Sequence, residues 1–409
     1  MTGPVLSLPH PADFPPPPSP SQRAAWSEAD RAARPARVER LRRRLAEEGL
    51  DAYFGIRSEH MRYLTGFVLR DGEDRLAGNS GRFLVSADDV VVMADSRYRL
   101  QAEAEAGGAR VAAVAYDLAA DWPGLVKGLG ARRVGAESAL IGHQLWRGLE
   151  AAAPDVELVE VAGWVEADRA TKEPAETERI RAACAVADRA LAGIVRRIRP
   201  GVTEQELAMA LEWEMRTGGA DALAFPIACL AGPNAALPHG SPGQREVRPG
   251  QVLLFDFGAM VDGYRSDMTR TLFVEEPSRR DEEVYRVVLA AQQAALDLLA
   301  RAARGECPSP SGRAADAAAR SVIEEAGYGP NFGHSTGHGI GLATHELPTL
   351  GRTSGDEPLA GPTVFSVEPG IYLDDETGVR IEDLVEFDPA AGRFAILTGF
   401  PKELLVLAV

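Results

Sequence analysis

The spacing of apolar residues in the first part of the chain predicts helices that alternate with strands. Val38, Leu41 and Leu45 recur at intervals of three and four residues, which predicts an amphipathic helix that ends near Gly49. Short apolar runs predict strands at residues 52–56, 82–85, 90–93 and 111–114, with helical sequence at 102–106. This alternation indicates an α/β domain.

Longer helical segments and turn-rich strands follow in the second part of the chain. Helix formers dominate residues 176–198, and a capping box of Thr203 and Glu206 opens the next helix. Residues 282–303 are again rich in alanine and leucine. Because the remaining strands are separated by turns instead of helices, this part is predicted to be an α+β domain.

Three parts are therefore expected along the chain. Residues 1–34 form a Pro-rich N-terminal arm, with four consecutive prolines at 15–18, which is extended or poorly ordered, or else laid over a partner subunit. Residues 35–165 form the α/β domain, and residues 166–409 form the α+β domain.

Composition excludes several classes of protein. Acidic residues outnumber basic ones, 60 to 44, and the net charge of -16 argues against a nucleic-acid partner. Three cysteines without paired spacing, Cys184, Cys229 and Cys307, predict neither disulfides nor a thiolate zinc site. No secretory signal is expected in residues 1–30, and no stretch of the chain has membrane-spanning length. We therefore expect a cytoplasmic protein without a membrane partner.

Two acidic residues flank a turn in the second part of the chain. Asp256 follows the apolar run 252–255, and Asp267 comes after a turn signal at 261–263. In a hairpin closed by a two-residue loop, both carboxylates lie on one face, directly opposed or one pair out of register. Such carboxylates repel each other unless a cation lies between them. The alternative is one strand-end cap and one exposed turn acid.

The same arrangement recurs downstream. Glu368 ends an apolar strand at 364–367, and Glu382 follows a turn at 374–378. Arg380 and Glu382 share one face of the second strand because side chains alternate along a strand. A second acidic hairpin opposite the first would bring four carboxylates around one point.

His338 lies between the two hairpins in the glycine-rich run 333–341. Glycine on both sides lets the backbone pass close to a bulky group, and imidazole is a common metal ligand. Four carboxylates and one imidazole suit Mn²⁺ best, with Co²⁺, Fe²⁺ or Zn²⁺ as alternatives. Because carboxylates can bridge, five side chains suffice for two ions about 3.5–4 Å apart that activate a shared water.

Several short motifs in one order resemble the metal-dependent "pita-bread" peptidases, which include methionine aminopeptidase, aminopeptidase P and prolidase. The motifs are Asp256-Phe257-Gly258, residues 266–271, residues 334–341 with His345-Glu346, Glu368-Pro369-Gly370 and residues 380–383. This resemblance covers roughly residues 172–409 and implies a pita-bread catalytic domain. Residues 63–67 and 95–98 resemble the creatinase/prolidase N-terminal domain. Methionine aminopeptidases usually lack that domain, so the proline-specific branch is favoured.

Carried over by position, the resemblance implies metal ligands and a proton shuttle. The five ligands would be Asp256, Asp267, His338, Glu368 and Glu382, of which Asp267 and Glu382 would bridge both ions. Glu368 would also pass a proton from the attacking water to the leaving nitrogen.

The resemblance further implies residues that contact the substrate. His239 and His345 would hydrogen-bond the substrate and the tetrahedral oxyanion, and His334 would line the substrate pocket. Arg380 would hold the substrate carboxylate or order the metal ligands, and an ion pair with Glu382 or Asp383 is an equal alternative. Tyr264 would either order the site or pack in the core.

The implied function is metal-dependent hydrolysis next to proline in short peptides. Proline lacks an amide N–H, so a dedicated site must protonate its nitrogen as it leaves. Glu368 and Glu382 are 14 residues apart, a compact hairpin that favours an Xaa-Pro dipeptidase over an Xaa-Pro aminopeptidase or a proline-specific carboxypeptidase. Metal-free creatinase-type hydrolysis and a non-catalytic binding module are disfavoured, since both lose ligands that are present here. A homodimer is expected because family members commonly form one.

Overall fold

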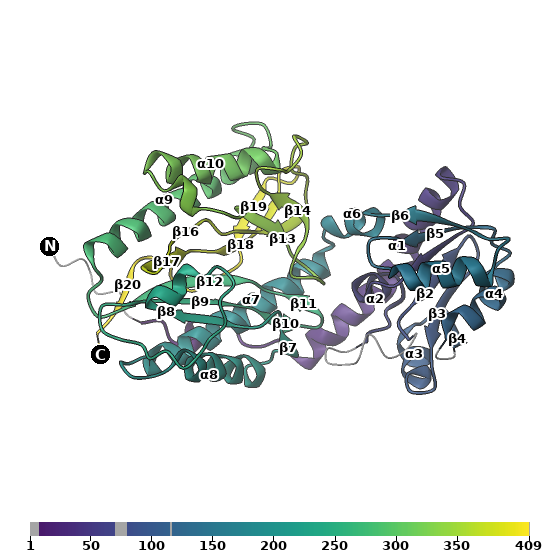
Figure 1. Ribbon diagram of the computed structural model, residues 1–409, viewed down its shortest axis with the longest axis horizontal. Helices are drawn as coiled ribbons and strands as arrows, with labels where there is room; N and C mark the ends of the chain where they lie inside the picture. Colours follow the sequence, from purple (N-terminus) through teal and green to yellow (C-terminus); the bar gives the residue numbers. More distant parts are fainter. Residues whose placement is uncertain (1–7, 70–79, 115–116, 409) are drawn as a thin grey trace. The chain divides into compact units, whose positions relative to one another are not determined.

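Contacts divide the chain into two units. The computed structural model describes residues 8–69, 80–114 and 117–408 (Figure 1). The N-terminal unit is Ala24–Asp168, and the C-terminal unit is Met1–Arg23 together with Arg169–Val409. The chain thus crosses between the units twice, after Arg23 and after Asp168.

A six-stranded mixed sheet forms the centre of the N-terminal unit, in the order β4-β3-β2-β1-β5-β6. The strands are β1 (Ala52–Gly55), β2 (Phe83–Ser86), β3 (Val90–Ala94), β4 (Arg110–Ala113), β5 (Arg133–Glu137) and β6 (Glu157–Val161). The helices of this part of the chain are α1 (Pro20–Glu47), α2 (Ser58–Thr65), α3 (Arg99–Glu105), α4 (Leu118–Gly128), α5 (His143–Ala152) and α6 (Trp164–Ala170). The predicted α/β character is confirmed.

The prediction of an extended arm over residues 1–34 is wrong in its second half, because α1 begins at Pro20. The Ser19 hydroxyl accepts a hydrogen bond from the Gln22 amide (3.3 Å), and the Gln22 side chain accepts one from the Ser19 amide (2.9 Å). This is a capping box, and proline is well tolerated at the first helical position. The local signal for a helix start outweighs the preceding proline run.

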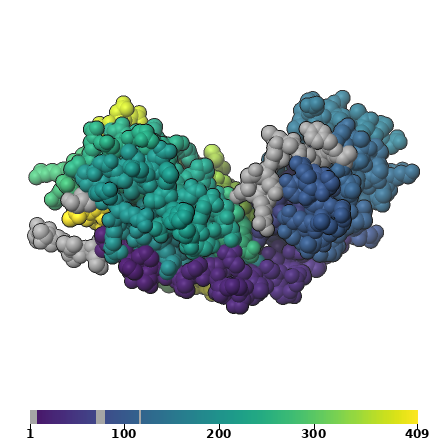
Figure 2. Space-filling view, turned by 90° about the horizontal axis from the view of Figure 1, so that it is seen from below, coloured from purple at the N-terminus to yellow at the C-terminus, as the bar shows by residue number. Residues whose placement is uncertain are grey.

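The first half of the arm packs on the C-terminal unit. The Arg189 guanidinium donates to the carbonyl oxygens of Pro11 (2.8 Å) and Phe14 (3.3 Å). At the start of α1, Arg23 forms an ion pair with Asp221 at 2.9 Å. Figure 2 shows this segment, in purple, against the teal surface of the same unit. These contacts anchor the arm to its own chain.

Strands from distant parts of the sequence build the sheets of the C-terminal unit. Their orders are β20-β12-β9-β8, β14-β13-β15-β18-β19, β11-β10-β7 and β16-β17. The strands are β7 (Ala222–Leu223), β8 (Ala228–Ala231), β9 (Val252–Phe257), β10 (Ala259–Val261), β11 (Tyr264–Arg265), β12 (Met268–Val274), β13 (Gly337–Gly339), β14 (Glu346–Leu350), β15 (Thr363–Val367), β16 (Gly370–Leu373), β17 (Thr377–Arg380), β18 (Asp383–Asp388), β19 (Arg393–Ile396) and β20 (Leu405–Leu407). The α-helices are α7 (Pro174–Ile194), α8 (Glu204–Thr217), α9 (Arg279–Ala303) and α10 (Gly312–Glu325).

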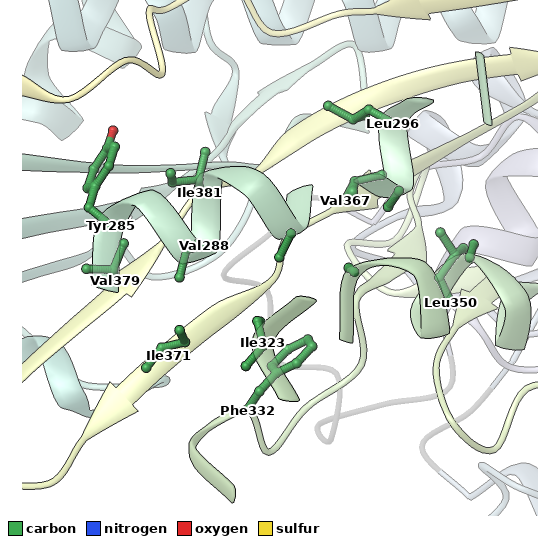
Figure 3. Packing of buried hydrophobic residues seen from close by; sticks show 14 of the residues in the cluster. Tyr285, Val288, Leu296, Ile323, Phe332, Leu350, Val367, Ile371, Val379 and Ile381 are labelled. Atoms are coloured by element: carbon green, nitrogen blue, oxygen red, sulfur yellow. The ribbon is translucent and has the colours of Figure 1, made fainter. Parts of the chain in front are cut away.

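A hydrophobic cluster packs α9 and α10 against these strands (Figure 3). Val288 of α9 lies in the same cluster as Val367 and Ile381, both fully buried. Adjacent side chains on a strand point to opposite faces. Glu368 and Glu382, the next residues in the sequence, are therefore directed away from this cluster.

Among the described helices, none combines the length and apolar character that crossing a membrane requires.

Candidate metal centre

The first acidic hairpin has the geometry that the sequence predicted. Strands β9 and β12 are antiparallel, with Asp256 opposite Thr269, so Asp267 lies one pair out of register on the same face. Between them, β10 and β11 are joined by Asp262 and Gly263, with φ angles of 46° and 74°. Two left-handed residues are typical of a tight type I′ turn, which keeps both acids close together.

The second hairpin places its two acids directly opposite each other. Strands β15 and β18 pair Val367 with Asp383, and β16 and β17 pair Gly370 with Arg380 in the same register. Glu368 and Glu382, between these two ladders, therefore face each other.

The side chains of both hairpins converge on His338. Its Nε2 lies 3.1 Å from Glu368 Oε1 and 3.8 Å from Asp267 Oδ2. Asp267, His338 and Glu382 each offer a ligand atom within 4.8 Å of the others. The Ser366 hydroxyl donates to Glu368 (2.9 Å) and accepts from the His338 amide (3.0 Å), which holds both residues.

Arg380 orders this cluster from the side of Asp256. Its Nη2 lies 2.6 Å from Asp256 Oδ2, and its Nε donates to the Thr269 hydroxyl at 2.9 Å. That hydroxyl donates to Glu382 at 2.7 Å. The remaining contacts of the guanidinium are with the Tyr372 hydroxyl (2.7 Å) and the Pro238 carbonyl (3.3 Å). Of the alternatives left open by the sequence, the ordering of metal ligands fits this geometry.

In the predicted alternative Arg380 pairs with Glu382 or Asp383, and Glu382 does attract the charge of Arg380. Asp383 instead forms ion pairs with Arg270 and Lys402, each at 2.7 Å. Asp383 is a buried residue of β18, and its carboxylate belongs to this separate network of ion pairs.

The buried carboxylates of the cluster repel one another, and the cationic side chains beside them do not fully offset this repulsion. Burial raises the pKa of Asp267 and of Glu382 well above the ordinary value, and neighbouring carboxylates add to the shift. Burial also acts against the charged forms of His338 and Glu368. Their mutual hydrogen bond nevertheless raises the pKa of His338 to about 9 and lowers that of Glu368 to about 2.

A divalent cation fits this environment. Glu382 Oε1 is buried, and no described group hydrogen-bonds to it. Carboxylate oxygens with one imidazole are the donor set of hard or borderline divalent ions. An ion here would satisfy the orphaned oxygen and offset the repulsion between the acids.

Three further histidines lie beside the cluster. The rings of His345 and His338 have centroids 4.1 Å apart. His239 is exposed and lies close enough to Asp256 to interact with it electrostatically. His334 Nε2 lies 2.8 Å from the Tyr372 hydroxyl, next to Arg380. The structure thus brings all three histidines near the predicted ligands.

Tyr264 lies apart from this group. Its hydroxyl donates to Glu176 of α7 at 3.0 Å, and its side chain is 1% exposed. The packing alternative is favoured by these contacts.

Sequence reasoning missed three residues that hold the site together, namely Ser366, Thr269 and Tyr372. Thr269 lies within the quoted motif at 266–271, so its position carried a signal. Ser366 lies two residues before Glu368, on the same face of the strand by alternation, whereas the contact of Tyr372 with His334 depends on segments that meet only in the folded chain.

Two family profiles match this chain. The profile of Metallopeptidase family M24 matches residues 178–388, and that of the Creatinase/Prolidase N-terminal domain matches residues 37–171. Uncharacterized peptidase YqhT of Bacillus subtilis (strain 168) is 34% identical over 371 residues, which cover 91% of this chain and 100% of that protein.

Solved structures are similar along almost the whole chain. An Xaa-Pro dipeptidase from Bacillus anthracis is 35% identical with a TM-score of 0.82, covering 91% of this chain and 99% of that one. An X-Pro aminopeptidase from Thermotoga maritima MSB8 is 34% identical with a TM-score of 0.76, covering 91% and 100%. The expected pairing of an N-terminal creatinase/prolidase domain with a pita-bread domain is confirmed. The chain therefore belongs to metallopeptidase family M24 and is a metal-dependent peptidase of that family.

Proposed function

We propose that this protein hydrolyses the peptide bond next to proline in short peptides, most simply as an Xaa-Pro dipeptidase. The observation that carries the proposal is the convergence of two acidic hairpins on His338. Hydrolysis next to proline is supported by similarity over most of the chain to an Xaa-Pro dipeptidase and to an X-Pro aminopeptidase.

Five side chains would hold two divalent cations: Asp256, Asp267, His338, Glu368 and Glu382. When bound, such ions supply Lewis-acid polarisation of the scissile carbonyl and lower the pKa of water. The oxygen-rich donor set favours Mn²⁺, with Co²⁺, Fe²⁺ or Zn²⁺ as alternatives.

Glu368 would take the proton of the attacking water and deliver it to the proline nitrogen. A hydrogen bond from the Ser366 hydroxyl fixes its carboxylate at one place. Protonation matters because a tertiary amide nitrogen leaves poorly without it. The exposed imidazoles of His345 and His239 would donate hydrogen bonds to the oxyanion as charge develops.

Preference for dipeptides rests on the compact hairpin beside the site. Strands β16 and β17 are joined by only three residues, 374–376. Because the dipeptidase and the aminopeptidase relatives are 35% and 34% identical, overall similarity favours neither specificity. Arg380 is engaged by Asp256, so His334 beside Tyr372 is the better candidate for contact with a substrate terminus.

Cleavage rates on Ala-Pro, Ala-Pro-Ala and longer proline peptides test the proposal, each with and without added Mn²⁺. We expect Ala-Pro to be cleaved fastest and chelation to abolish cleavage. Preference for Ala-Pro-Ala with release of the first alanine would assign an aminopeptidase, and release of the last residue a carboxypeptidase. A metal-loaded protein that cleaves none of them would be a non-catalytic binding module.

We also propose that the protein is a cytoplasmic homodimer. Analytical ultracentrifugation of the full chain measures the assembly directly, and a monomer at micromolar concentration would refute the dimer.

A further inference from the structure

A buried cluster of three charged side chains lies immediately behind His345. Glu346 contacts Arg169 through one carboxylate oxygen and Lys172 through the other, the latter at 2.9 Å. The three side chains are 3%, 2% and 1% exposed, respectively. Lys172 also donates to the carbonyl oxygens of Arg169 (2.6 Å) and Ala170 (3.4 Å). Neither the metal site nor the proposed mechanism uses these charges.

The cluster is connected to the backbone that carries His345. Glu346 accepts a hydrogen bond from the Ala343 amide at 3.3 Å, across the turn that contains His345. The Lys172 amide donates to the Pro362 carbonyl at 2.7 Å, which fixes the base of the cluster. Burial disfavours the Glu346 carboxylate, but the two cations lower its pKa below the ordinary value. Glu346 is therefore held as an anion.

The two neighbours point in different directions. The ring of His345 faces His338, with centroids 4.1 Å apart, whereas the Glu346 side chain is buried among the cations. Consecutive side chains in extended backbone point to opposite sides. Anchoring of Glu346 therefore restricts the backbone from which His345 projects.

The ion cluster leaves no room for a side chain at Gly341, the last glycine of the run at 333–341. A Cβ at this position would lie 2.4 Å from Glu346 Oε1 and 3.2 Å from Lys172 Cε. The Gly341 amide donates to the Ala343 carbonyl at 3.0 Å. A side chain here would displace Glu346, so the glycine and the ion cluster belong to one arrangement.

We propose that Glu346, Arg169 and Lys172 are positioning residues that hold His345 in place beside the metal-binding side chains. The proposal rests on the proposed function, in which His345 donates to the oxyanion. Burying three charges costs free energy, and apolar residues packed in their place would often stabilise the fold at least as much. Their benefit here is orientation, because a catalytic imidazole must be fixed before the transition state forms.

Two substitutions test the cluster in the full-length, metal-loaded protein. Glu346→Gln keeps the shape but removes the anion, and Lys172→Met removes one cation while leaving Arg169. For each we expect kcat on Ala-Pro to fall by about 10- to 100-fold, with KM and bound metal close to wild type. Arg189→Met, which loses hydrogen bonds to Pro11 and Phe14 in the same unit, is the matched control and should keep wild-type kcat. A fall of kcat in the control equal to that of both variants would overturn the proposal.

A double-mutant cycle separates positioning from general stability. In a His345→Ala background, Glu346→Gln should lower kcat no further, because the residue it positions is already missing. If the fold-losses of kcat in the two single variants multiply in the double variant, the cluster does not act through His345. An unchanged kcat in both Glu346→Gln and Lys172→Met would likewise contradict the proposal.

Amide hydrogen exchange gives a readout that needs no activity. Glu346→Gln should accelerate amide exchange at residues 343–347. The control variant Arg189→Met should show the wild-type exchange rates there. If wild-type protein fails to cleave proline peptides, the proposed function fails, yet exchange still judges whether the cluster orders this segment. Unchanged exchange at 343–347 in both cluster variants would overturn the inference.

Discussion

At the scale of single residues, the site is defined by carboxylates that cannot all be ionised without a cation. Asp267 and Glu382 are each at most 5% exposed, and burial with mutual repulsion raises the pKa of both. Arg380 balances Asp256, and His338 balances Glu368. The pKa values of Asp267 and Glu382 are raised well above their ordinary values, so a cation between these two carboxylates would relieve the repulsion.

Asp267→Ala should therefore lose at least one equivalent of bound metal, because a bridging ligand is removed. Elemental analysis of purified, manganese-loaded protein measures this. Asp356→Ala is the control, since that acid has a side chain 79% exposed in the same unit and should keep the wild-type content. Full metal content in Asp267→Ala would contradict the ligand assignment.

Glu137 shows the same residue-scale electrostatics in the N-terminal unit. Its carboxylate accepts hydrogen bonds from the Tyr53 hydroxyl (2.7 Å) and the amides of Ile56 (2.7 Å) and Arg57 (2.8 Å), and lies 2.6 Å from His60 Nδ1. Burial acts to raise the pKa of Glu137, but His60 and the other donors together lower it below 4.5.

Glu137→Gln should lower the free energy of unfolding by about 1–3 kcal/mol at pH 7. A lowered folded-state pKa stabilises the fold above the unfolded value of 4.5, and this stabilisation is lost as pH falls through the folded value. The deficit of the variant should thus shrink below pH 4.5, as measured by urea unfolding across pH. Glu157→Gln on β6, with a side chain 61% exposed, should change stability by under about 0.5 kcal/mol. A deficit independent of pH would contradict this account.

At the scale of elements, close packing of two backbone segments places the loop that carries Pro238 and His239. Strand β17 packs on the 3₁₀ helix η3 (Gly232–Ala236), which leads into Pro238 and His239. A Cβ at Gly378 of β17 would lie 1.8 Å from the carbonyl oxygen of Ala235. The glycine therefore permits the approach that brings the Pro238 carbonyl to Arg380.

Gly378→Ala should destabilise the C-terminal unit by at least about 1–3 kcal/mol, since η3 must move away. Thermal unfolding followed by circular dichroism measures the change. Gly355→Ala is a matched control, because a Cβ there would meet only the Glu357 amide nitrogen at 4.0 Å. Equal melting temperatures for Gly378→Ala and wild type would show that η3 adapts without cost.

At the scale of the whole molecule, metal binding and folding are linked. The five proposed ligands come from residues 256–382, so the site exists only when the C-terminal unit is folded. A ligand that binds only the folded state stabilises it by about 2.7 kcal/mol at a concentration 100 times its Kd.

Chelator-treated protein should therefore melt at a lower temperature than manganese-loaded protein. Differential scanning calorimetry measures the difference, and the increase on loading should be smaller in Asp267→Ala. Superimposable melting curves with and without metal would argue against a site built on the folded unit.

Much of the candidate site was predictable because its geometry is local. Alternation along strands and a two-residue turn placed Asp256 and Asp267 on one face, as the register confirms. The capping box at Thr203 and Glu206 is likewise present in the structure. The prediction for residues 20–34 is wrong. The proline run before them favours an extended arm, but the cap formed by Ser19 and Gln22 starts a helix there.

The sequence by itself determined the domain order, the two acidic hairpins and the motifs of family M24. These follow from residue type and short-range periodicity, which act within a few positions of the chain. Only the tertiary structure decided that Arg380 orders Asp256, that Tyr264 turns to Glu176, and that two cations anchor Glu346. Each of these depends on side chains more than 80 residues apart in sequence. A buried charge takes whichever partner the packed core brings within reach, and no local pattern encodes that choice.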